Sequence, residues 1–353
     1  GLVRTSLVNT ELKPEKMQRL GAGIDMSILE ERVNIGLDVY SNTVNDMILS
    51  VKPASISGSQ SNVILNAGKM RNLGFDFNLN TRILNKQHFK WDVGLMVSRY
   101  KNEVLSLGGK EYYNEYLGAT IQTKAGQPLG AFYGYKTDGV YATAADAASE
   151  GMNIREGLVL IPFGAGDMRF VNQNTDKVID ENDRVVIGDP NPDFFGNINT
   201  RLKYRNLELS AIFIYSLGGD VYNYSRSQLE SMSMSYNQLQ TVLHRWRAEG
   251  DITSIPLATP GDPMGNARFS DRWIEDGSYA RLKNLTLSYD LNLKIPVIQN
   301  SKIYVSGENL LTFTRYKGLD PEFAAGESPL YMGVDPCVVP QSRTISAGII
   351  LGL

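Results

Sequence analysis

The residues with the clearest potential for chemistry lie in one polar segment, "NQNTDKVIDEND", at positions 172–183. Oxygen-bearing side chains recur there at alternate positions, as they do in loops that wrap a calcium ion. Read on the spacing of such a loop, positions 1, 3, 5, 7, 9 and 12 are Asn172, Asn174, Asp176, Val178 (through its backbone carbonyl), Asp180 and Asp183. The segment therefore predicts a site for calcium or a similar hard cation.

Three features of the same segment favour a different interpretation. Asn172 carries no charge, and Asp183 is shorter than the bidentate Glu of a typical loop. Lys177 stands at the sixth position, where such loops have glycine; it lacks glycine's freedom at positive φ and brings a like charge near the cation. The alternative is an Asx-rich turn that keeps its shape without metal. Apart from this calcium ion, the sequence indicates no cofactor.

A second candidate is a group of tyrosines in "KEYYNEYLG". Tyr112, Tyr113 and Tyr116 could stack on sugar rings or on the side chains of a peptide, so they are candidate substrate-binding residues. The alternative is that they pack within a long loop.

Composition excludes several classes of function. The net charge is −3 with 21% charged residues, which argues against a nucleic-acid binder. Cys337 is the one cysteine, so an internal disulfide and a cysteine-based zinc cluster are excluded. His88 and His244 are the two histidines, and the GxSxG, HExxH and phosphate-loop motifs are missing. We therefore expect no enzyme.

The elements that position these residues are strands with two different faces. In the segment 285–291, Leu285, Leu287, Tyr289 and Leu291 alternate with polar residues, which places them on one face of a strand. The same pattern recurs and predicts nine strands, near 17–29, 33–49, 68–84, 88–104, 193–204, 207–217, 278–291, 301–313 and 343–353.

Short and long connections alternate between these strands. The short ones lie at 30–32, 85–87, 205–206 and 292–300, and the long ones near 50–67, 105–192, 218–277 and 314–342. This order requires that "GAFYGYKTDGVY", 130–141, forms a strand inside a long loop. Short turns at one end and long loops at the other are typical of an outer-membrane β-barrel, with periplasmic turns and extracellular loops.

In that interpretation the apolar faces contact lipid and the polar faces line a wet lumen. Phe89, Trp91, Tyr204 and Tyr289 then fall near the periplasmic strand ends, where interfacial aromatics belong. The alternative is a soluble sandwich or propeller whose apolar faces meet as a core. Strands of about 11–17 residues favour the membrane, because a typical strand has about 5–6 residues. An odd number of strands leaves two open edges, so we expect part of a larger barrel.

Several segments, taken in order, resemble the C-terminal half of the SusC/RagA family of TonB-linked outer-membrane transporters of Bacteroidetes. They include "NAGKMRNLGFDFNLNTRI", "GQPLGAFYGYKTDGVY", "GDMRFVNQNTDKVIDENDRVVIGDPNPDFFGNI", "DRWIEDGSYARLKNLTLSY" and "IYVSGENLLTFTRYKGLDPEF". The resemblance runs from about residue 8 to 353. It implies an all-β fold in which residues 1–353 are the last nine strands of a 22-stranded transmembrane barrel.

The resemblance also implies a function and partners. The complete protein would import glycan fragments or oligopeptides through the outer membrane of a Gram-negative bacterium. A SusD-like surface lipoprotein would act as a lid, and the TonB complex would rearrange an N-terminal plug. Compared with that family, we expect this chain to lack the plug and the TonB-contacting segment. Because "GLVRTSLVNT" has no apolar region, we also expect no signal peptide on it. The last residue, Leu353, stands where an aromatic is usual.

Two other classes stay open at this stage. One is a soluble or surface-attached β-sandwich module that binds carbohydrate. The other, a secreted carbohydrate-active enzyme, has less support, because no pair of carboxylates can be placed across a cleft from the sequence.

Overall fold

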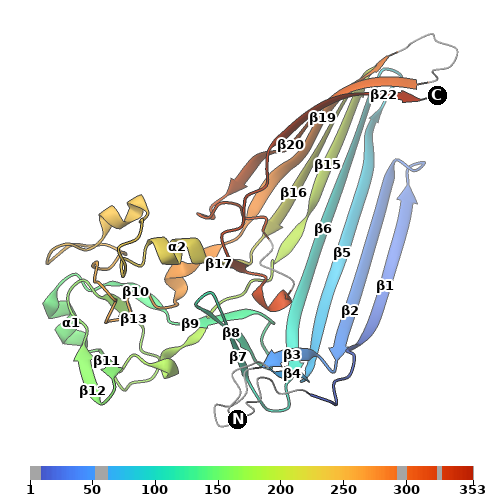
Figure 1. The fold of residues 1–353 in the computed structure, drawn as a ribbon. Coiled ribbons are helices and arrows are strands. Elements are labelled where there is room, and N and C mark those ends of the chain that lie inside the picture. The colour runs from blue at the N-terminus through green and yellow to red at the C-terminus, as the bar shows by residue number, and fades with distance from the viewer. Residues whose placement is uncertain (1–8, 52–62, 292–299, 324–327, 353) are drawn as a thin grey trace, which may run out of the picture.

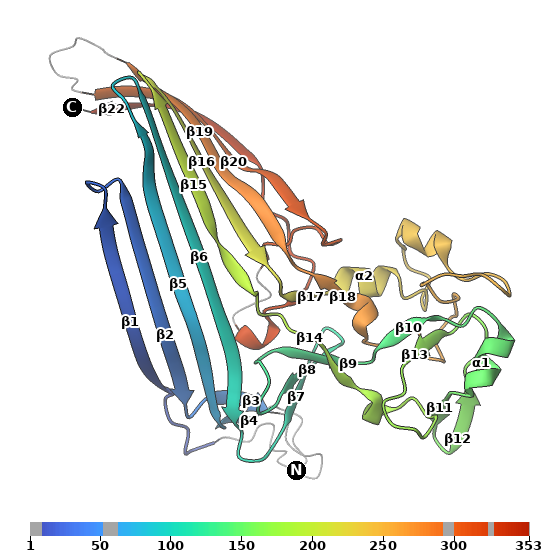
Figure 2. The ribbon, with the colours of Figure 1, turned by 180° about the vertical axis from the view of Figure 1, so that it is seen from behind.

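A computed structural model describes residues 9–51, 63–291, 300–323 and 328–352. Its dominant element is an antiparallel sheet of nine long strands in the order β1-β2-β5-β6-β15-β16-β19-β20-β22 (Figures 1 and 2). These strands are β1 (Lys16–Ile28), β2 (Val33–Asn45), β5 (Lys69–Asn85), β6 (Phe89–Ser106), β15 (Phe194–Tyr204), β16 (Leu207–Leu217), β19 (Tyr279–Leu291), β20 (Asn300–Thr314) and β22 (Thr344–Gly352). All nine predicted strands are present.

The largest difference from the prediction concerns the second strand, which was expected to run to residue 49. It ends at Asn45 because Asp46 has a φ of 57°, which breaks the extended backbone. The chain then turns into β3 (Ile48–Val51), which pairs with β4 (Val63–Asn66) in a separate two-stranded sheet. Most of the predicted turn at 292–300, and Leu353, lie outside the described residues.

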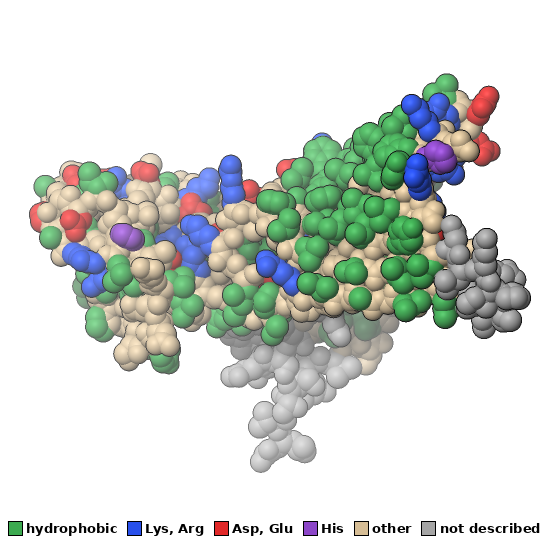
Figure 3. Space-filling model, turned by 90° about the horizontal axis from the view of Figure 1, so that it is seen from above, with side chains coloured by type: hydrophobic (Ala, Val, Ile, Leu, Met, Phe, Trp, Pro, Cys, Tyr) green, Lys and Arg blue, Asp and Glu red, His purple; other side chains and the backbone are tan. Residues whose placement is uncertain are grey.

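One face of the nine-stranded sheet is apolar across its width. The pairing register aligns Met26, Ile35, Leu79, Leu95, Ile198 and Phe213 in a single row over six neighbouring strands. Many side chains of this face are exposed, and they form the continuous hydrophobic area in Figure 3; Ile24 is 67% exposed and Ile349 is 68% exposed. The three buried hydrophobic clusters found among the described residues lie mainly in the long loops and at the strand ends that adjoin them. A sandwich would bury the apolar face of this sheet, so the sandwich alternative is wrong.

The opposite face is polar and closely packed between strands. Asn34 pairs with Asn80, and Asp38 pairs with Asp76. Gly74 allows the ring of Tyr40 on the neighbouring strand to lie over the backbone, because a Cβ at this position would be 2.6 Å from the Tyr40 hydroxyl.

Aromatic side chains lie at the short-turn end of the sheet. Phe89 pairs with Tyr204, and Tyr289 pairs with Leu207. Trp91 donates a hydrogen bond from Nε1 to Thr200 Oγ1 (2.9 Å). This band has the composition of a membrane–water interface, as the sequence predicted.

The long loops fold into small sheets and helices of their own. The segment 130–141 lies among them as β9 and β10, as predicted, and not in the large sheet. The loop elements are β7 (Tyr112–Tyr116), β8 (Ala119–Thr123), β9 (Ala131–Gly134), β10 (Thr137–Val140), α1 (Ala144–Glu150), β11 (Asn153–Glu156), β12 (Val159–Pro162), β13 (Met168–Phe170), β14 (Val185–Gly188), β17 (Asp220–Asn223), α2 (Tyr224–Leu229), β18 (Ile274–Asp276) and β21 (Val334–Asp335), with 3₁₀ turns at Glu181–Asp183, Gln240–His244, Asp271–Trp273 and Pro329–Tyr331. Among the described residues, no helix has the length and apolar character needed to cross a bilayer.

Three of the long loops pack into one body, here called the loop platform (107–192, 218–277 and the described residues of 315–342). Its central cluster contains residues from each loop: Ala119, Ile121, Phe132, Tyr222, Trp273 and Val334. Trp273 is fully buried there. A parallel pairing of β17 with β21, through Tyr222 and Val334, joins the second loop to the third. The platform extends from the long-loop end of the sheet (Figure 1).

The apolar face yields a direct test of membrane contact. Ile198→Arg places a cation near the middle of β15 on that face, and we expect it to destabilise the full-length protein by about 2–4 kcal/mol. Urea unfolding in lipid vesicles, followed by the heat-modifiable mobility of the folded barrel, measures the change. Asn197→Arg, one residue away on the polar face, is the matched control and should cost much less. Equal costs for the two variants would contradict this assignment of faces.

Candidate functional site

The calcium-loop-like segment folds as a chain of Asx turns. The backbone N–H of Asn174 donates to Asn172 Oδ1 (3.0 Å), and that of Asp176 donates to Asn174 Oδ1 (3.0 Å). The N–H of Val178 donates to Asp176 Oδ1 (2.9 Å), and the N–H of Asn182 donates to Asp180 Oδ1 (2.8 Å). These contacts are Asx turns, in which an Asn or Asp side chain binds the backbone two residues further on.

Asp183 closes the segment from inside. Its side chain is fully buried, and it accepts the backbone N–H groups of Gln173 on Oδ1 (2.8 Å) and of Asp180 on Oδ2 (2.9 Å). Lys177 has a φ of 60°, the left-handed conformation that glycine supplies at this position of a calcium loop. Among the described residues, no group of three or more His, Cys, Asp or Glu side chains is arranged to hold a metal. The calcium site stays a prediction.

The three candidate tyrosines lie on one strand, β7, but not on one surface. Tyr113 points to the opposite face of the strand from Tyr112 and Tyr116, as alternation requires. Tyr112 packs against the cluster around Val104, and Tyr116 packs against the central cluster of the platform, stacked on Tyr331 at a centroid distance of 4.5 Å.

Tyr113 is the most exposed of the three, at 44%. Its ring lies 5.3 Å from that of Tyr133, and its hydroxyl donates to Glu111 Oε2 (2.8 Å). Burial, followed by the hydrogen bond to Glu111, raises the pKa of the Tyr113 hydroxyl. Of the predicted aromatic group, Tyr113 therefore offers the most accessible ring, beside Tyr133, which the sequence did not indicate.

Charged pairs cross between strands on the polar face, near the short-turn end. They are Arg82–Asp92 (3.1 Å), Arg201–Glu208 (2.9 Å) and Lys203–Asp290 (2.6 Å), with Lys302 at 3.5 Å from Asp290. Cross-strand pairs of opposite charge stabilise a sheet modestly and leave its surface hydrophilic. This face is suited to line a water-filled lumen.

Toward the long-loop end, the same face anchors the segment that follows β20. Arg281 is almost fully buried, and it binds Asp320 and Glu322, the latter at 2.7 Å. Lys283 also contacts Glu322, at 2.8 Å. Removing one member of a buried ion pair of this kind is strongly destabilising, so these contacts fix the path of the loop.

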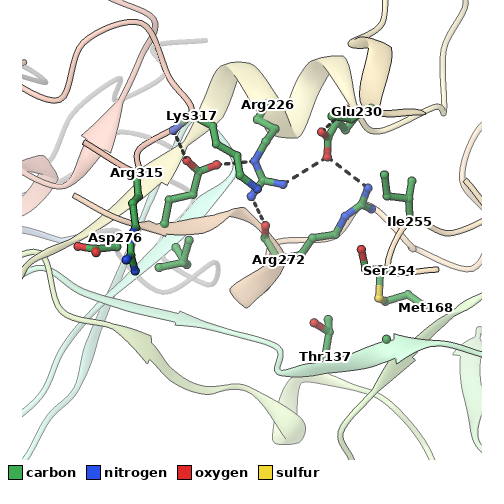
Figure 4. Close-up of a pocket in the computed structure, with 14 residues that line it drawn as sticks. Thr137, Met168, Arg226, Glu230, Ser254, Ile255, Arg272, Asp276, Arg315 and Lys317 are labelled. Carbon is green, nitrogen blue, oxygen red and sulfur yellow. Dashed lines mark hydrogen bonds and ion pairs between the residues drawn. The ribbon is translucent and has the colours of Figure 1, made fainter. Parts of the chain in front are cut away.

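A pocket that sequence reasoning missed lies in the loop platform (Figure 4). It has a volume of about 520 Å³, and β10, β13, α2, β18 and the residues after β20 line it. Four cationic side chains and three acidic ones face it, namely Arg226, Arg272, Arg315, Lys317, Glu230, Glu275 and Asp276. They come from three stretches of the chain that only the folded platform brings together. The one feature of the sequence that could have indicated this pocket is the cluster of charged residues around Trp273 in "DRWIEDG".

The arginines at the pocket wall are held against Trp273. The Arg226 guanidinium lies 5.2 Å from the Trp273 ring centroid, and that of Arg272 lies 4.2 Å from it. Arg226 donates to Glu275 and to the backbone carbonyl of Arg272, and lies 3.3 Å from Glu230. Burial lowers the pKa of Arg272 to about 10, so this guanidinium keeps its charge at neutral pH.

Similarity to known proteins agrees with this architecture. The family model "TonB dependent receptor-like, beta-barrel" matches residues 3–310. TonB-dependent receptor P3 of Formosa agariphila is 31% identical, over 99% of this chain and 35% of the relative. TonB-dependent receptor SusC of Bacteroides thetaiotaomicron is 26% identical, over 99% of this chain and 33% of the relative.

A solved structure, "Structure of the RagAB peptide transporter", superposes with a TM-score of 0.75 at 24% identity, over 96% of this chain and 35% of that one. This likeness shows the fold. The chain thus spans about a third of the length of the relatives that it matches. Because the family model matches most of the sequence, the chain belongs to the TonB-dependent receptor family, as part of the β-barrel of an outer-membrane protein of a Gram-negative bacterium.

Proposed function

We propose that the complete protein imports glycan fragments or oligopeptides across the outer membrane, powered by the TonB complex and covered by a SusD-like surface lipoprotein. The described chain supplies a section of barrel wall, a polar lumen surface and the loop platform. It supplies no catalytic step. Membership of the receptor family and the relatives named SusC and RagAB support this proposal.

The loop platform is the observation that carries the proposal. Three loops share one buried cluster around Trp273, and a parallel strand pair joins two of them, so they pack as one body. A rigid surface loses little conformational entropy when a partner docks on it. Such a surface at the long-loop end, which is extracellular in bacterial barrels, suits a lid protein.

The remainder of the same protein is the second partner in this proposal. The outer edges of β1 and β22 carry no strand partner within the described residues. Unpaired edges cannot stay in hydrocarbon, because each unsatisfied backbone group costs several kcal/mol there. Further barrel strands would pair with both edges, and a plug would fill the lumen against the polar face.

We expect uptake and lid binding to depend on the platform. A strain that lacks the full-length receptor should lose uptake of fluorescently labelled oligopeptides or oligosaccharides, and the wild-type gene should restore it. Trp273→Ala should remove about 3–5 kcal/mol from the platform core and so abolish co-purification of the surface lipoprotein, while the barrel stays folded.

Ile198→Ala is the control, since it shortens an apolar side chain on the lipid face and should leave both readouts unchanged. Unchanged uptake of both substrate classes in the deletion strain would refute the proposed function. Retained co-purification in Trp273→Ala would refute the docking role of the platform.

The calcium prediction for 172–183 is tested by calorimetric titration of CaCl₂ into the full-length receptor. We expect weak binding in the wild-type protein, with a Kd near or above about 1 mM, as in weak extracellular calcium modules. Lys177→Gly removes the positive charge and suits the left-handed backbone, so it should tighten binding about tenfold. Asp176→Asn should weaken it. Heat-silent titrations of both the wild-type protein and Lys177→Gly would reject the site.

A further inference from the structure

The two buried acidic side chains of the platform pocket, Glu230 and Glu275, are already bound by donors on both oxygens. Glu275 accepts hydrogen bonds from Arg226 Nε and from the backbone N–H of Lys317, the latter at 2.8 Å. Glu230 accepts the hydroxyl of Thr241 on Oε1 (2.5 Å), and its Oε2 faces Arg226. The remaining acid, Asp276, accepts the backbone N–H of Ser278 (2.9 Å).

Three of the four cationic side chains of the pocket, all except Arg226, keep donors without acceptors. The side chain of Arg272 is only 7% exposed, yet neither of its terminal nitrogens has a hydrogen-bond partner among the described residues. Its nearest carboxylate, Glu230 Oε2, lies 3.6 Å away, beyond hydrogen-bond distance. A buried guanidinium with unused N–H groups is costly unless a ligand or water satisfies it.

Two further cations stand at the other side of the pocket. Arg315 and Lys317 directly follow β20, and both residues are exposed. The side chain of neither makes an ion pair with a described residue. Apart from one oxygen of the exposed Asp276, the spare hydrogen-bonding capacity of the pocket is therefore of the donor type, on one buried and two exposed positive groups.

We infer that this pocket binds the carboxylate of an anionic unit of the imported ligand, either an acidic residue of a peptide or a uronic acid of a glycan. Arginine pairs with a carboxylate through two parallel hydrogen bonds, and Trp273 holds the planar group of Arg272 in place. A volume of about 520 Å³ is within the usual range for a small-ligand site and accommodates one such unit. This inference deepens the proposed import function and rests on it.

The test is equilibrium binding to the full-length receptor in detergent. Triglutamate and trigalacturonate are the acidic probes, and trialanine and maltotriose are their neutral counterparts. We expect at least one acidic probe to bind, with an affinity that falls as salt rises, and the neutral counterpart to bind at least about tenfold more weakly. The acidic probe that binds identifies the source of the carboxylate.

The decisive variant is Arg315→Gln/Lys317→Gln. Both side chains are exposed and make no ion pair with a described residue, so we expect the variant to fold normally. It should weaken binding of the acidic probe about tenfold or more. Lys110→Gln/Arg155→Gln removes the same charge from exposed loop positions outside the pocket and should change binding less than about twofold. Arg272→Gln should act like the decisive variant, with thermal unfolding as its folding control.

Three outcomes would overturn the inference: failure of both acidic probes to bind, equal weakening by the decisive and the control variants, or unchanged binding in the decisive variant. Uptake in cells is measured separately. A receptor that binds triglutamate in detergent but imports nothing would refute the import function and leave the carboxylate site standing. Import that proceeds equally with Arg315→Gln/Lys317→Gln, together with unchanged binding, would refute the site alone.

Discussion

Backbone hydrogen bonding in hydrocarbon is the constraint on which the rest of this structure depends. A bilayer provides no water for an exposed N–H or C=O group, so strands that cross it must pair with neighbours. Each adjacent pair in the nine-stranded sheet is antiparallel and in continuous register, apart from a few bulges. This pairing fixes which side chains face lipid, and it sends every long loop to the same end of the sheet.

That constraint explains why so much of the sheet could be predicted from the sequence. A shift of the pairing register by one residue would turn every apolar side chain of a strand toward the lumen, so the face of each strand could be predicted. This holds for Leu285, Leu287 and Tyr289. The alternation of short and long connections then placed 130–141 in a loop, which the structure confirms. The predicted end of the second strand was wrong, because the alternation of apolar and polar residues does not reveal the positive φ of Asp46.

The residues of the loop platform do not alternate between apolar and polar types in this regular way, so its sites were harder to predict. Arg226 and Arg272 lie 46 positions apart in one long loop, and Arg315 lies in another, so the three meet only because both loops fold back to one place. The arrangement of the tyrosine group, in contrast, could have been predicted. Once β7 is known to be extended, strand alternation alone places Tyr113 on the opposite face from Tyr112 and Tyr116. The Asx turns at 172–183 were foreseen as an alternative, because Asn and Asp side chains bond their own backbone locally.

The parallel pairing of β17 with β21 sets an order of assembly. β17 lies before β19 in the chain, and β21 lies after β20, so the two can meet only when the β19–β20 hairpin has brought their ends together. Contacts of such long sequence separation form late, because the entropy of loop closure must first be overcome. The surface at the long-loop end is therefore expected to form after the β19–β20 hairpin, so that a partner docking there would meet a receptor in which this part of the wall is already folded.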